Sequence, residues 1–278
     1  MGVAAGIKTY FIYTNGTTAG QEPFLNWIVA LNNVTNEAPI TNSVSYGDTE
    51  ISLTADYMNR VNVEFQKFGA TGHTLLFASG DSGVGCNQCQ RFVPNFPASS
   101  PFVTAVGGTE LTGSNSKTEV GVSFSGGGFS DTFAQPSYQA AAVAAYLASG
   151  VKLPAQSFWN KTSRAYPDIS AFATNFEIVV HGLTTMVDGT SCAAPTAAAI
   201  ISMINDLRLQ SSMSPLGFLN PWLYSKAAAT TGALYDVTIG QNSHTCCSGF
   251  LAAPGWDPVT GLGTLNYTML VNLALSNN

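Results

Sequence analysis

An amphipathic helix followed by a continuous apolar strand is the feature that most restricts the fold of this chain. Leu53, Tyr57, Val61, Phe65 and Phe68 recur every three or four residues, which places them on one face of a helix. The next run, Thr74–Ser79, is apolar without alternation, as in strands that a parallel sheet buries on both faces. The sequence therefore predicts an α/β fold with a mostly parallel central sheet and helices on both faces.

Further runs continue this alternation along the chain. Strands are predicted for Ile7–Tyr13, Thr41–Gly47, Phe102–Val106 and Glu177–His181, and helices for Glu22–Leu31, Ala140–Ala148 and Cys192–Ile204. Parallel sheets bind ligands beyond the carboxyl ends of their strands, and Gly47, Gly80 and Gly83 stand at such ends. We expect the functional residues to lie near these glycines.

The composition argues against two classes of partner. The 278 residues carry 10 basic and 16 acidic side chains, and no basic run could neutralise the phosphates of a nucleic acid. No apolar stretch approaches the roughly 18 residues that a membrane span requires. Only 9% of the residues are charged and the pI is about 4.9, which favours an acid milieu in which carboxylates are protonated.

The five cysteines and the sequons point to a secretory protein. Cys86 and Cys89 form a CxxC, Cys246 and Cys247 are adjacent, and Cys192 stands alone. Zinc needs two well-spaced pairs, so disulfides between the first group and the second are the better interpretation, with the pairing left open. N-x-S/T sequons, the acceptors of N-linked glycans, occur at Asn15, Asn33, Asn160 and Asn266. Because the first six residues lack the basic start of a signal peptide, we expect the N-terminus to be missing.

A candidate nucleophile lies in the segment Asp188–Pro195. Ser191 is predicted at the N-terminus of a helix, where the positive helix end favours developing negative charge. Pro195 fits a first turn, whose amides lack partners. A bare serine here could simply cap the helix, but Gly-Thr-Ser followed by proline four residues later is the nucleophile signature of the subtilisin-like clan. None of the three histidines, His73, His181 and His244, stands in the helix-start context of a subtilisin base.

Asp81, in the run Ser79–Gly83, occupies the position at which subtilisins carry an asparagine that donates to the oxyanion. An ionised carboxylate would repel an oxyanion, whereas a protonated carboxyl group can donate a hydrogen bond to it. Asp81 therefore suits an enzyme that works at low pH or a site that keeps the group neutral. The alternative is that Asp81 only caps a turn.

Taken together, these motifs resemble the sedolisin family of serine-carboxyl peptidases over essentially the whole chain. The similarity also rests on Gly20–Leu25, Val44–Asp48, Leu75–Gly85, Phe96–Pro101, Ser125–Ser130, Ala165–Asp168, Pro215–Pro221 and Pro254–Gly263. The resemblance implies a subtilisin-like α/β fold and lysosomal or secreted acid proteolysis that removes tripeptides from free N-termini. It also implies a catalytic Glu-Asp-Ser set, an oxyanion-hole aspartate and one Ca²⁺ ion.

Carried over residue by residue, the resemblance makes Ser191 the nucleophile and Asp81 the oxyanion-hole acid. The segments expected to line the substrate cleft are Ser45, Tyr46 and Gly47, and Ser125, Gly126, Gly127 and Gly128. The two halves of the expected calcium site are Asp236 with Val237, and Ala253 and Gly255 with Asp257. Ala253 stands where related sequences have glycine, which a carbonyl ligand tolerates if the backbone angle suits alanine.

The family's glutamate base and its aspartate partner lie four residues apart on a helix that precedes the segment matching Gly2–Tyr13. No Glu-x-x-x-Asp precedes Ile7, and the first acidic residue is Glu22. We therefore expect residues 1–278 to be a peptidase domain without its prosegment and Glu/Asp helix, and with little activity alone.

Two alternatives stay open besides an acid peptidase acting on peptide substrates. One is a pseudo-peptidase that binds peptides or partners through its glycine-lined cleft. The other is a neutral hydrolase that uses one of the histidines. The sequence leaves the oligomeric state undetermined.

Overall fold

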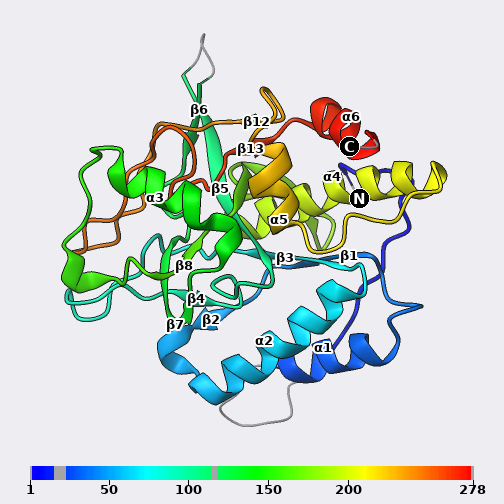
Figure 1. Ribbon diagram of the computed structural model, residues 1–278, viewed down its shortest axis with the longest axis horizontal. Helices are drawn as coiled ribbons and strands as arrows, with labels where there is room; N and C mark the ends of the chain where they lie inside the picture. Colours follow the sequence, from blue (N-terminus) through cyan, green and yellow to red (C-terminus); the bar gives the residue numbers. More distant parts are fainter. Residues whose placement is uncertain (1, 16–22, 114–117, 277–278) are drawn as a thin grey trace.

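The computed structural model describes residues 2–15, 23–113 and 118–276, which are organised around a seven-stranded sheet (Figure 1). The strand order is β1-β3-β5-β9-β13-β12, and β6 pairs with β5. The strands are β1 (Thr41–Val44), β3 (Thr74–Ala78), β5 (Thr104–Thr112), β6 (Thr118–Gly121), β9 (Ile169–Phe172), β12 (Leu234–Tyr235) and β13 (Thr264–Leu265). From β1 to β13 the pairs are parallel, while β6 and β12 are antiparallel to their neighbours. The predicted mostly parallel sheet is confirmed.

Helices cover both faces of this sheet, as predicted. In Figure 1, α1 (Phe24–Asn33) and α2 (Ala55–Ala70) lie below β1 and β3, and α4 (Thr190–Gln210) lies on the opposite side. Strand β3 contributes side chains to the cores on both faces of the sheet. Leu75 and Phe77 pack in the core beneath α1 and α2, whereas Leu76 packs in the core that includes α4. This alternation is what a strand buried on both faces requires.

Short elements complete the described part of the chain. The helical ones are α3 (Ala140–Ala148), α5 (Asn220–Trp222), α6 (Tyr267–Leu275), η1 (Glu50–Ser52), η2 (Ser137–Gln139), η3 (Gln156–Phe158) and η4 (Leu223–Ala227). The remaining strands form three pairs: β2 (Asp48–Thr49) with β4 (Asn95–Phe96), β7 (Gly128–Ala134) with β8 (Ser163–Tyr166), and β10 (Phe176–Val180) with β11 (Leu183–Val187). The strand predicted at Glu177–His181 is therefore one arm of a separate hairpin.

One predicted strand is wrong. Ile7–Tyr13 forms no strand, and the side chains of Phe11 and Tyr13 are 95% and 78% exposed. A strand is stable only with a hydrogen-bonded neighbour, and none of the described strands pairs with this segment. The predicted helix start at Glu22 lies outside the described residues, and α1 begins at Phe24.

Helix α4 packs closely on the sheet because its inner face carries small residues. Ala193, Ala194 and Ala197 are fully buried, and the helix contacts β5 and β9. No helix within the described ranges combines the length and the apolar content needed to cross a membrane.

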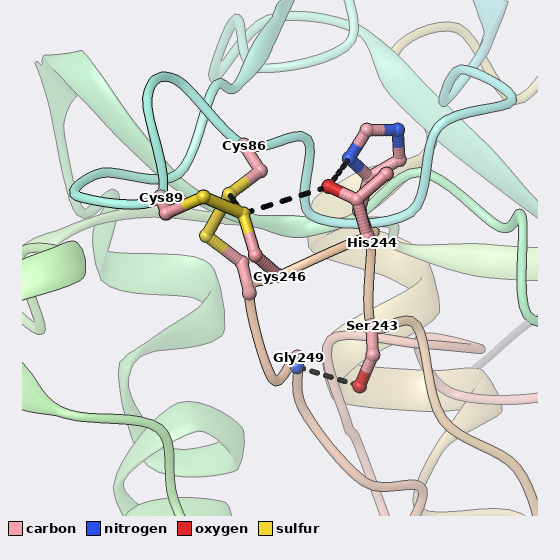
Figure 2. Close-up of a disulfide and its surroundings, with 8 residues drawn as sticks. Cys86, Cys89, Ser243, His244, Cys246 and Gly249 are labelled. Carbon is pink, nitrogen blue, oxygen red and sulfur yellow. Dashed lines mark hydrogen bonds between the residues drawn. A yellow bond between two sulfur atoms is a disulfide. The ribbon is translucent and has the colours of Figure 1, made fainter.

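Two disulfides join the loop after β3 to a loop near the C-terminus (Figure 2). Cys86 is bonded to Cys247 and Cys89 to Cys246, which confirms the predicted link between the two cysteine groups. Cys192 is a free thiol. The cross-links hold the segment that follows Asp81 against the loop that leads to the predicted calcium residues.

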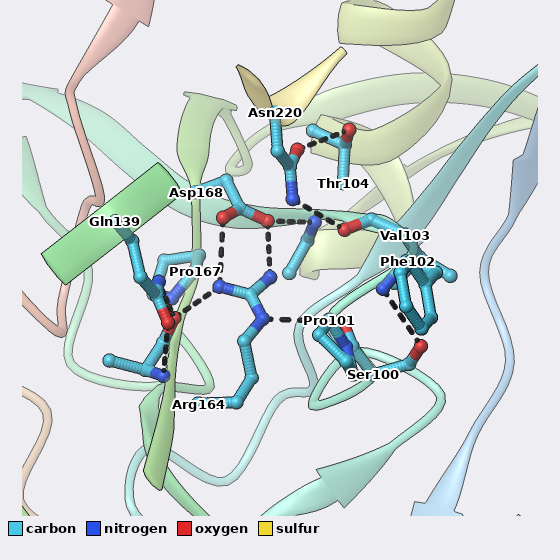
Figure 3. A network of polar contacts seen from close by, with 12 residues as sticks. Ser100, Pro101, Phe102, Val103, Thr104, Gln139, Arg164, Pro167, Asp168 and Asn220 are labelled. Carbon is cyan, nitrogen blue, oxygen red and sulfur yellow. Dashed lines mark hydrogen bonds and ion pairs between the residues drawn. The ribbon is translucent and has the colours of Figure 1, made fainter. Parts of the chain in front are cut away.

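A buried ion pair fixes the turn between β8 and β9 (Figure 3). Arg164 and Asp168 are both fully buried, and the guanidinium donates to Asp168 Oδ1 at 2.8 Å and to Oδ2 at 2.6 Å. The Tyr224 hydroxyl and the Ala105 amide also donate to this carboxylate, at 3.0 and 2.8 Å. Because the charges are paired and hydrogen-bonded, the cluster fits a structural role at the centre of the fold.

Candidate active site

Ser191 lies in the first turn of α4, on the surface of the molecule. Gly189 precedes the helix with φ +149°, which favours glycine, and its amide donates to the Ala173 carbonyl at 2.8 Å. None of the described residues forms a hydrogen bond with the Ser191 hydroxyl. The positive end of α4 therefore presents an exposed hydroxyl group, as a nucleophile requires.

The expected position of Pro195 in the first turn is wrong. Because α4 begins at Thr190, Pro195 is its sixth residue, and a residue there would normally donate its N–H to the Ser191 carbonyl. Proline cannot, and the Ser45 hydroxyl donates to that carbonyl instead, at 3.0 Å. Ser45 thus contacts the backbone of the nucleophile directly.

Asp81 follows β3 and caps α4 from outside the helix. Its Oδ1 accepts hydrogen bonds from the Thr190 amide at 2.6 Å and from the Thr190 hydroxyl at 2.7 Å. Its Oδ2 accepts none from the described residues. A β-carbon on Gly189 would lie 3.0 Å from Oδ2, so glycine allows this close approach. Asp81 therefore accepts from the first residue of α4 and not from its own turn, and this contact occupies only one of its two carboxyl oxygens.

A cavity of about 260 Å³ brings the predicted residues together. Ser191, Asp81, Ser45, Tyr46 and Gly47 all line it. The complete lining is Ser45, Tyr46, Gly47, Ala78, Gly80, Asp81, Asn95, Phe96, Ala98, Thr190 and Ser191. A β-carbon on Gly47 would lie 2.8 Å from the Phe96 carbonyl oxygen, which explains the glycine there.

Sequence reasoning gave no role to Thr190 or to Asn95, Phe96 and Ala98 in this wall. Thr190 was visible in the Gly-Thr-Ser motif, and Phe96–Pro101 was one of the segments that carry the resemblance. Neither motif shows by itself which side chains face the cavity.

The segment Ser125–Gly128 is fully buried and lies outside the lining of this cavity. The Ser125 hydroxyl accepts from the Gly108 amide and donates to the Val259 carbonyl, while the Gly126 amide donates to the Gly80 carbonyl at 2.8 Å. Side chains at Gly126 and Gly127 would overlap with the Ser79 and Pro258 carbonyls. The segment therefore packs against the backbone of the loop that carries Asp81. Its contact with a substrate stays a prediction.

No described residue that lines this cavity is a histidine. His73 is buried, stacks on Phe68 and pairs with the Thr71 hydroxyl at 2.9 Å, and burial lowers the pKa of its imidazole. His244 pairs with Thr245 beside the disulfides (Figure 2), and His181 lies in the turn between β10 and β11. The alternative that uses a histidine base gains no support from these positions.

A larger, mostly apolar cavity of about 430 Å³ also has Tyr46 in its lining. It is bordered by the segment 7–12 and by parts of α1, β1 and α4, and Ser191 and Asp81 do not line it. The smaller cavity is therefore the candidate site, because the chemically suited side chains meet there.

Cys192 adjoins Ser191, yet its thiol is held in the neutral form. Partial burial raises its pKa, and the nearby carboxylates of Asp81 and Asp188 raise it further. Because thiols react as thiolates, this environment does not favour Cys192 as a nucleophile.

The two halves of the expected calcium site lie side by side. Asp236 and Val237 follow β12, and the Gly255 amide donates to Asp236 Oδ2 at 2.8 Å. Asp257 is fully buried and accepts from the amides of Ala253, Val259 and Thr260. Ala253 is not among the residues with positive φ, so alanine fits here without strain.

These residues offer oxygen atoms, which Ca²⁺ prefers. Burial raises the pKa of Asp257 to about 7, and none of the described basic side chains forms an ion pair with it. A buried carboxylate without a cationic partner is costly, and a bound cation would offset that cost. The donor set therefore fits a calcium ion.

No family model matches the chain, whereas individual relatives do. It is 46% identical over 283 residues to tripeptidyl-peptidase 1 of Canis lupus familiaris, covering 98% of this chain and 49% of that protein. It is 42% identical over 277 residues to tripeptidyl-peptidase 1 of Dictyostelium discoideum, covering 99% of this chain and 46% of that protein. The chain thus spans about half the length of the curated relatives that it matches.

Solved structures show the same relationship at the level of the fold. Pseudomonas sedolisin, described as a serine-carboxyl proteinase in complex with pseudo-iodotyrostatin, superposes with a TM-score of 0.72 and 28% identity. This match covers 90% of the chain and 69% of sedolisin. The psychrophilic protease S41 has a TM-score of 0.56 at 18% identity, which supports the fold alone. The resemblance to sedolisins, and to tripeptidyl peptidase I among them, is confirmed.

Proposed function

Because the chain belongs to the sedolisin family of serine-carboxyl peptidases, we propose that it carries the nucleophile and the oxyanion donor of an acid peptidase. The proposed reaction is hydrolysis of a peptide bond, with release of tripeptides from free N-termini. The observation that carries this proposal is that Ser191 and Asp81 line one cavity, in which no described residue forms a hydrogen bond with Asp81 Oδ2.

Each residue has a defined part in this proposal. The Ser191 hydroxyl attacks the carbonyl carbon of the peptide, and a protonated Asp81 donates a hydrogen bond to the oxygen that becomes negative. Ser45 holds the Ser191 carbonyl, while Tyr46 and Gly47 form the wall beside it. Since Asp81 donates only when protonated, the proposed activity belongs to acid pH.

The proton of Ser191 needs an acceptor. Apart from Asp81, no carboxylate of the described residues lines the cavity. We infer that the described residues alone give little activity, and that a carboxylate outside the described ranges acts as the base. The resemblance implies a glutamate in this role, supported by an aspartate.

This proposal can be tested on the chain itself by supplying the base as a small carboxylate. Formate or acetate, added at increasing concentration near pH 4 to 5, should raise the hydrolysis of an N-terminally free tripeptide reporter. Ser191→Ala should abolish the increase and leave the fold intact. If the two chains respond equally to the carboxylate, Ser191 is not the nucleophile.

A second candidate function is favoured because Asp81 is the only carboxylate among the described residues that line the cavity. A protein with this cleft and no turnover could bind peptides as a pseudo-peptidase. Calorimetry with a tripeptide that has a free N-terminus would then show binding that Ser191→Ala leaves unchanged, without hydrolysis at any carboxylate concentration.

Calcium is proposed as a structural ion held by Asp236, Asp257 and the carbonyls of Val237, Ala253 and Gly255. It would tie the segment after β12 to the loop that follows the disulfides. Adding Ca²⁺ to chelator-treated protein should raise Tm by several degrees, and Asp257→Asn should remove that increase. Asp206→Asn, an acidic residue on α4, serves as the control and should keep it. An equal response in both variants would contradict this assignment.

We also propose that the protein acts in a lysosomal or extracellular compartment. Two disulfides fit an oxidising secretory route. Of the sequon asparagines, Asn15, Asn33 and Asn160 are exposed and Asn266 is partly buried, so the first three are the better candidates for glycosylation.

A further inference from the structure

We propose that Thr190 is a positioning residue that decides which oxygen of Asp81 carries the proton. Thr190 keeps Oδ1 as an acceptor, so the proton of the neutral carboxyl group is confined to Oδ2, from which it is donated to the oxyanion. This inference rests on the proposed function, in which Asp81 acts in its protonated form.

The direction of the hydrogen bonds carries the argument. The Gly80 amide lies 3.1 Å from Thr190 Oγ1, and an amide can only donate, so Oγ1 accepts there. The single hydroxyl proton of Thr190 is then free to point at Asp81 Oδ1, 2.7 Å away. The Thr190 amide donates to the same oxygen at 2.6 Å.

Asp81 Oδ1 therefore receives a proton from the Thr190 amide, which can only donate, and a second from the Thr190 hydroxyl, whose oxygen already accepts from Gly80. If Oδ1 itself were protonated, it would have to share its lone pairs between that covalent O–H bond and the two donors from Thr190. The other oxygen, Oδ2, has no donor among the described residues, so the proton of the neutral form belongs there. This is the arrangement that an oxyanion donor needs.

Thr190 and Asp81 differ in burial. Thr190 is fully buried and Asp81 is exposed, so without Thr190 the carboxyl group could rotate and exchange its two oxygens. The titratable groups around Asp81 are few. Tyr46 lines the same cavity, the Cys192 thiol is electrostatically coupled to Asp81, and Asp188 is coupled to that thiol.

The pair Thr190→Val and Thr190→Ser isolates the hydroxyl group. Valine keeps the shape of threonine and the amide bond but removes the hydroxyl donor, while serine retains it. The Asp81 carboxyl can be followed by ¹³C NMR on the aspartate-labelled chain, assigned by comparison with Asp81→Asn. This measurement requires no catalysis.

Removal of a hydrogen bond that stabilises the ionised carboxylate should move the protonation midpoint of Asp81 to higher pH. We expect an upward shift of about one pH unit in Thr190→Val and little change in Thr190→Ser. In the formate-dependent assay, Thr190→Val should lower the rate about tenfold or more at saturating reporter, and its activity should persist to higher pH than that of the parent chain. A merely structural defect would lower the rate without moving the pH limit upward.

An unchanged midpoint in folded Thr190→Val would overturn the inference, and so would an equal loss of rate in the serine variant. Failure of the proposed function gives a different result. In that case the midpoint still moves, but the parent chain shows no Ser191-dependent hydrolysis with formate.

Discussion

At the residue scale, the two carboxyl oxygens of Asp81 have different surroundings, and the proposed function gives each oxygen its own task. Oδ1 satisfies the amide of Thr190 at the start of α4, and Oδ2 is left over for a ligand. An asparagine could satisfy the same helix end and also donate, but its ability to donate would not depend on pH. The carboxyl group thus makes the proposed oxyanion donor conditional on acid.

Asp81→Asn should therefore change the pH profile more than the maximal rate. The amide oxygen can accept from Thr190 while the amide nitrogen donates at any pH. If Asp81 is the oxyanion donor, the formate-dependent activity of the parent chain should fall as pH rises, because an ionised carboxylate has no proton to donate. The variant should keep its formate-dependent activity toward neutral pH, as measured by reporter hydrolysis between about pH 3 and 7.

Asp81→Leu is the matched control, since it removes the donor without adding another. A loss of about 10²–10³ in rate is expected at every pH. An Asp81→Asn profile that keeps the upper pH limit of the parent chain would mean that another group sets that limit.

The sequence predicted residues that lie together in the fold, but it did not predict their contacts. Ser191, Asp81 and Ser45–Gly47 do meet in one cavity. The bond from Ser45 to the Ser191 carbonyl joins residues 146 positions apart, and such a contact leaves no periodic signal in the sequence. Ser125–Gly128 could be recognised as a glycine motif, but only the packing shows that its glycines are needed beneath the Asp81 loop.

At the scale of elements, periodicity located the helices and strands whose packing partners lie within the described residues. The spacing of apolar residues predicted α2, and the run after it predicted β3. Ile7–Tyr13 has the composition of a strand, yet composition cannot supply the neighbouring strand that it needs. The hairpin β10–β11 is a strand pair outside the sheet, which its local sequence does not distinguish from a sheet strand.

The start of α4 depends on a contact from another element. Ser45→Ala removes the hydroxyl that donates to the Ser191 carbonyl, a position at which Pro195 has no N–H to offer. We expect a loss of about 1 kcal/mol in the free energy of unfolding.

Pro195→Ala restores that N–H, so Ser45→Ala should cost much less in the Pro195→Ala background. Urea unfolding of the parent chain, both single variants and the double variant measures this coupling. If the two single effects simply add, the Ser45 hydroxyl does not replace the missing helical bond.

His73 makes the junction of α2 and β3 sensitive to acid. Burial lowers the pKa of His73, so its imidazole stays neutral in the fold at pH values where the unfolded chain protonates it. Over that range the unfolded state binds more protons, and the free energy of unfolding therefore falls as pH falls.

His73→Leu should make stability less dependent on pH between about 7 and 5, even though it removes the bond to Thr71. Thermal or urea unfolding at both pH values would show a smaller difference than in the parent chain. His244→Gln, a histidine beside the disulfides, is the control. An unchanged pH dependence in His73→Leu would contradict the assignment.

For the whole molecule, the two disulfides close nearly the same large loop. The bonded cysteines are separated by 161 and 157 residues, and both bridges join the same two segments. Once either bridge has formed, the other closes only a small ring. One bridge alone therefore removes most of the conformational entropy that the two bridges together remove from the unfolded chain.

The effects of removing the bridges should be far from additive. Replacing either Cys86 and Cys247 or Cys89 and Cys246 with alanine should cost about 2 kcal/mol in the free energy of unfolding, and replacing all four about 7 kcal/mol. Urea unfolding of the three variants measures these costs, with Cys192→Ala as the control for a cysteine outside the bridges. Two single-bridge costs that sum to the cost of removing both would show that the bridges stabilise separate parts of the fold. Single-bridge costs that sum to much less than the cost of removing both would instead mean that either bridge alone is enough. One disulfide would then hold the Asp81 loop close to the segment that carries the calcium residues, because both bridges join these same two parts of the chain.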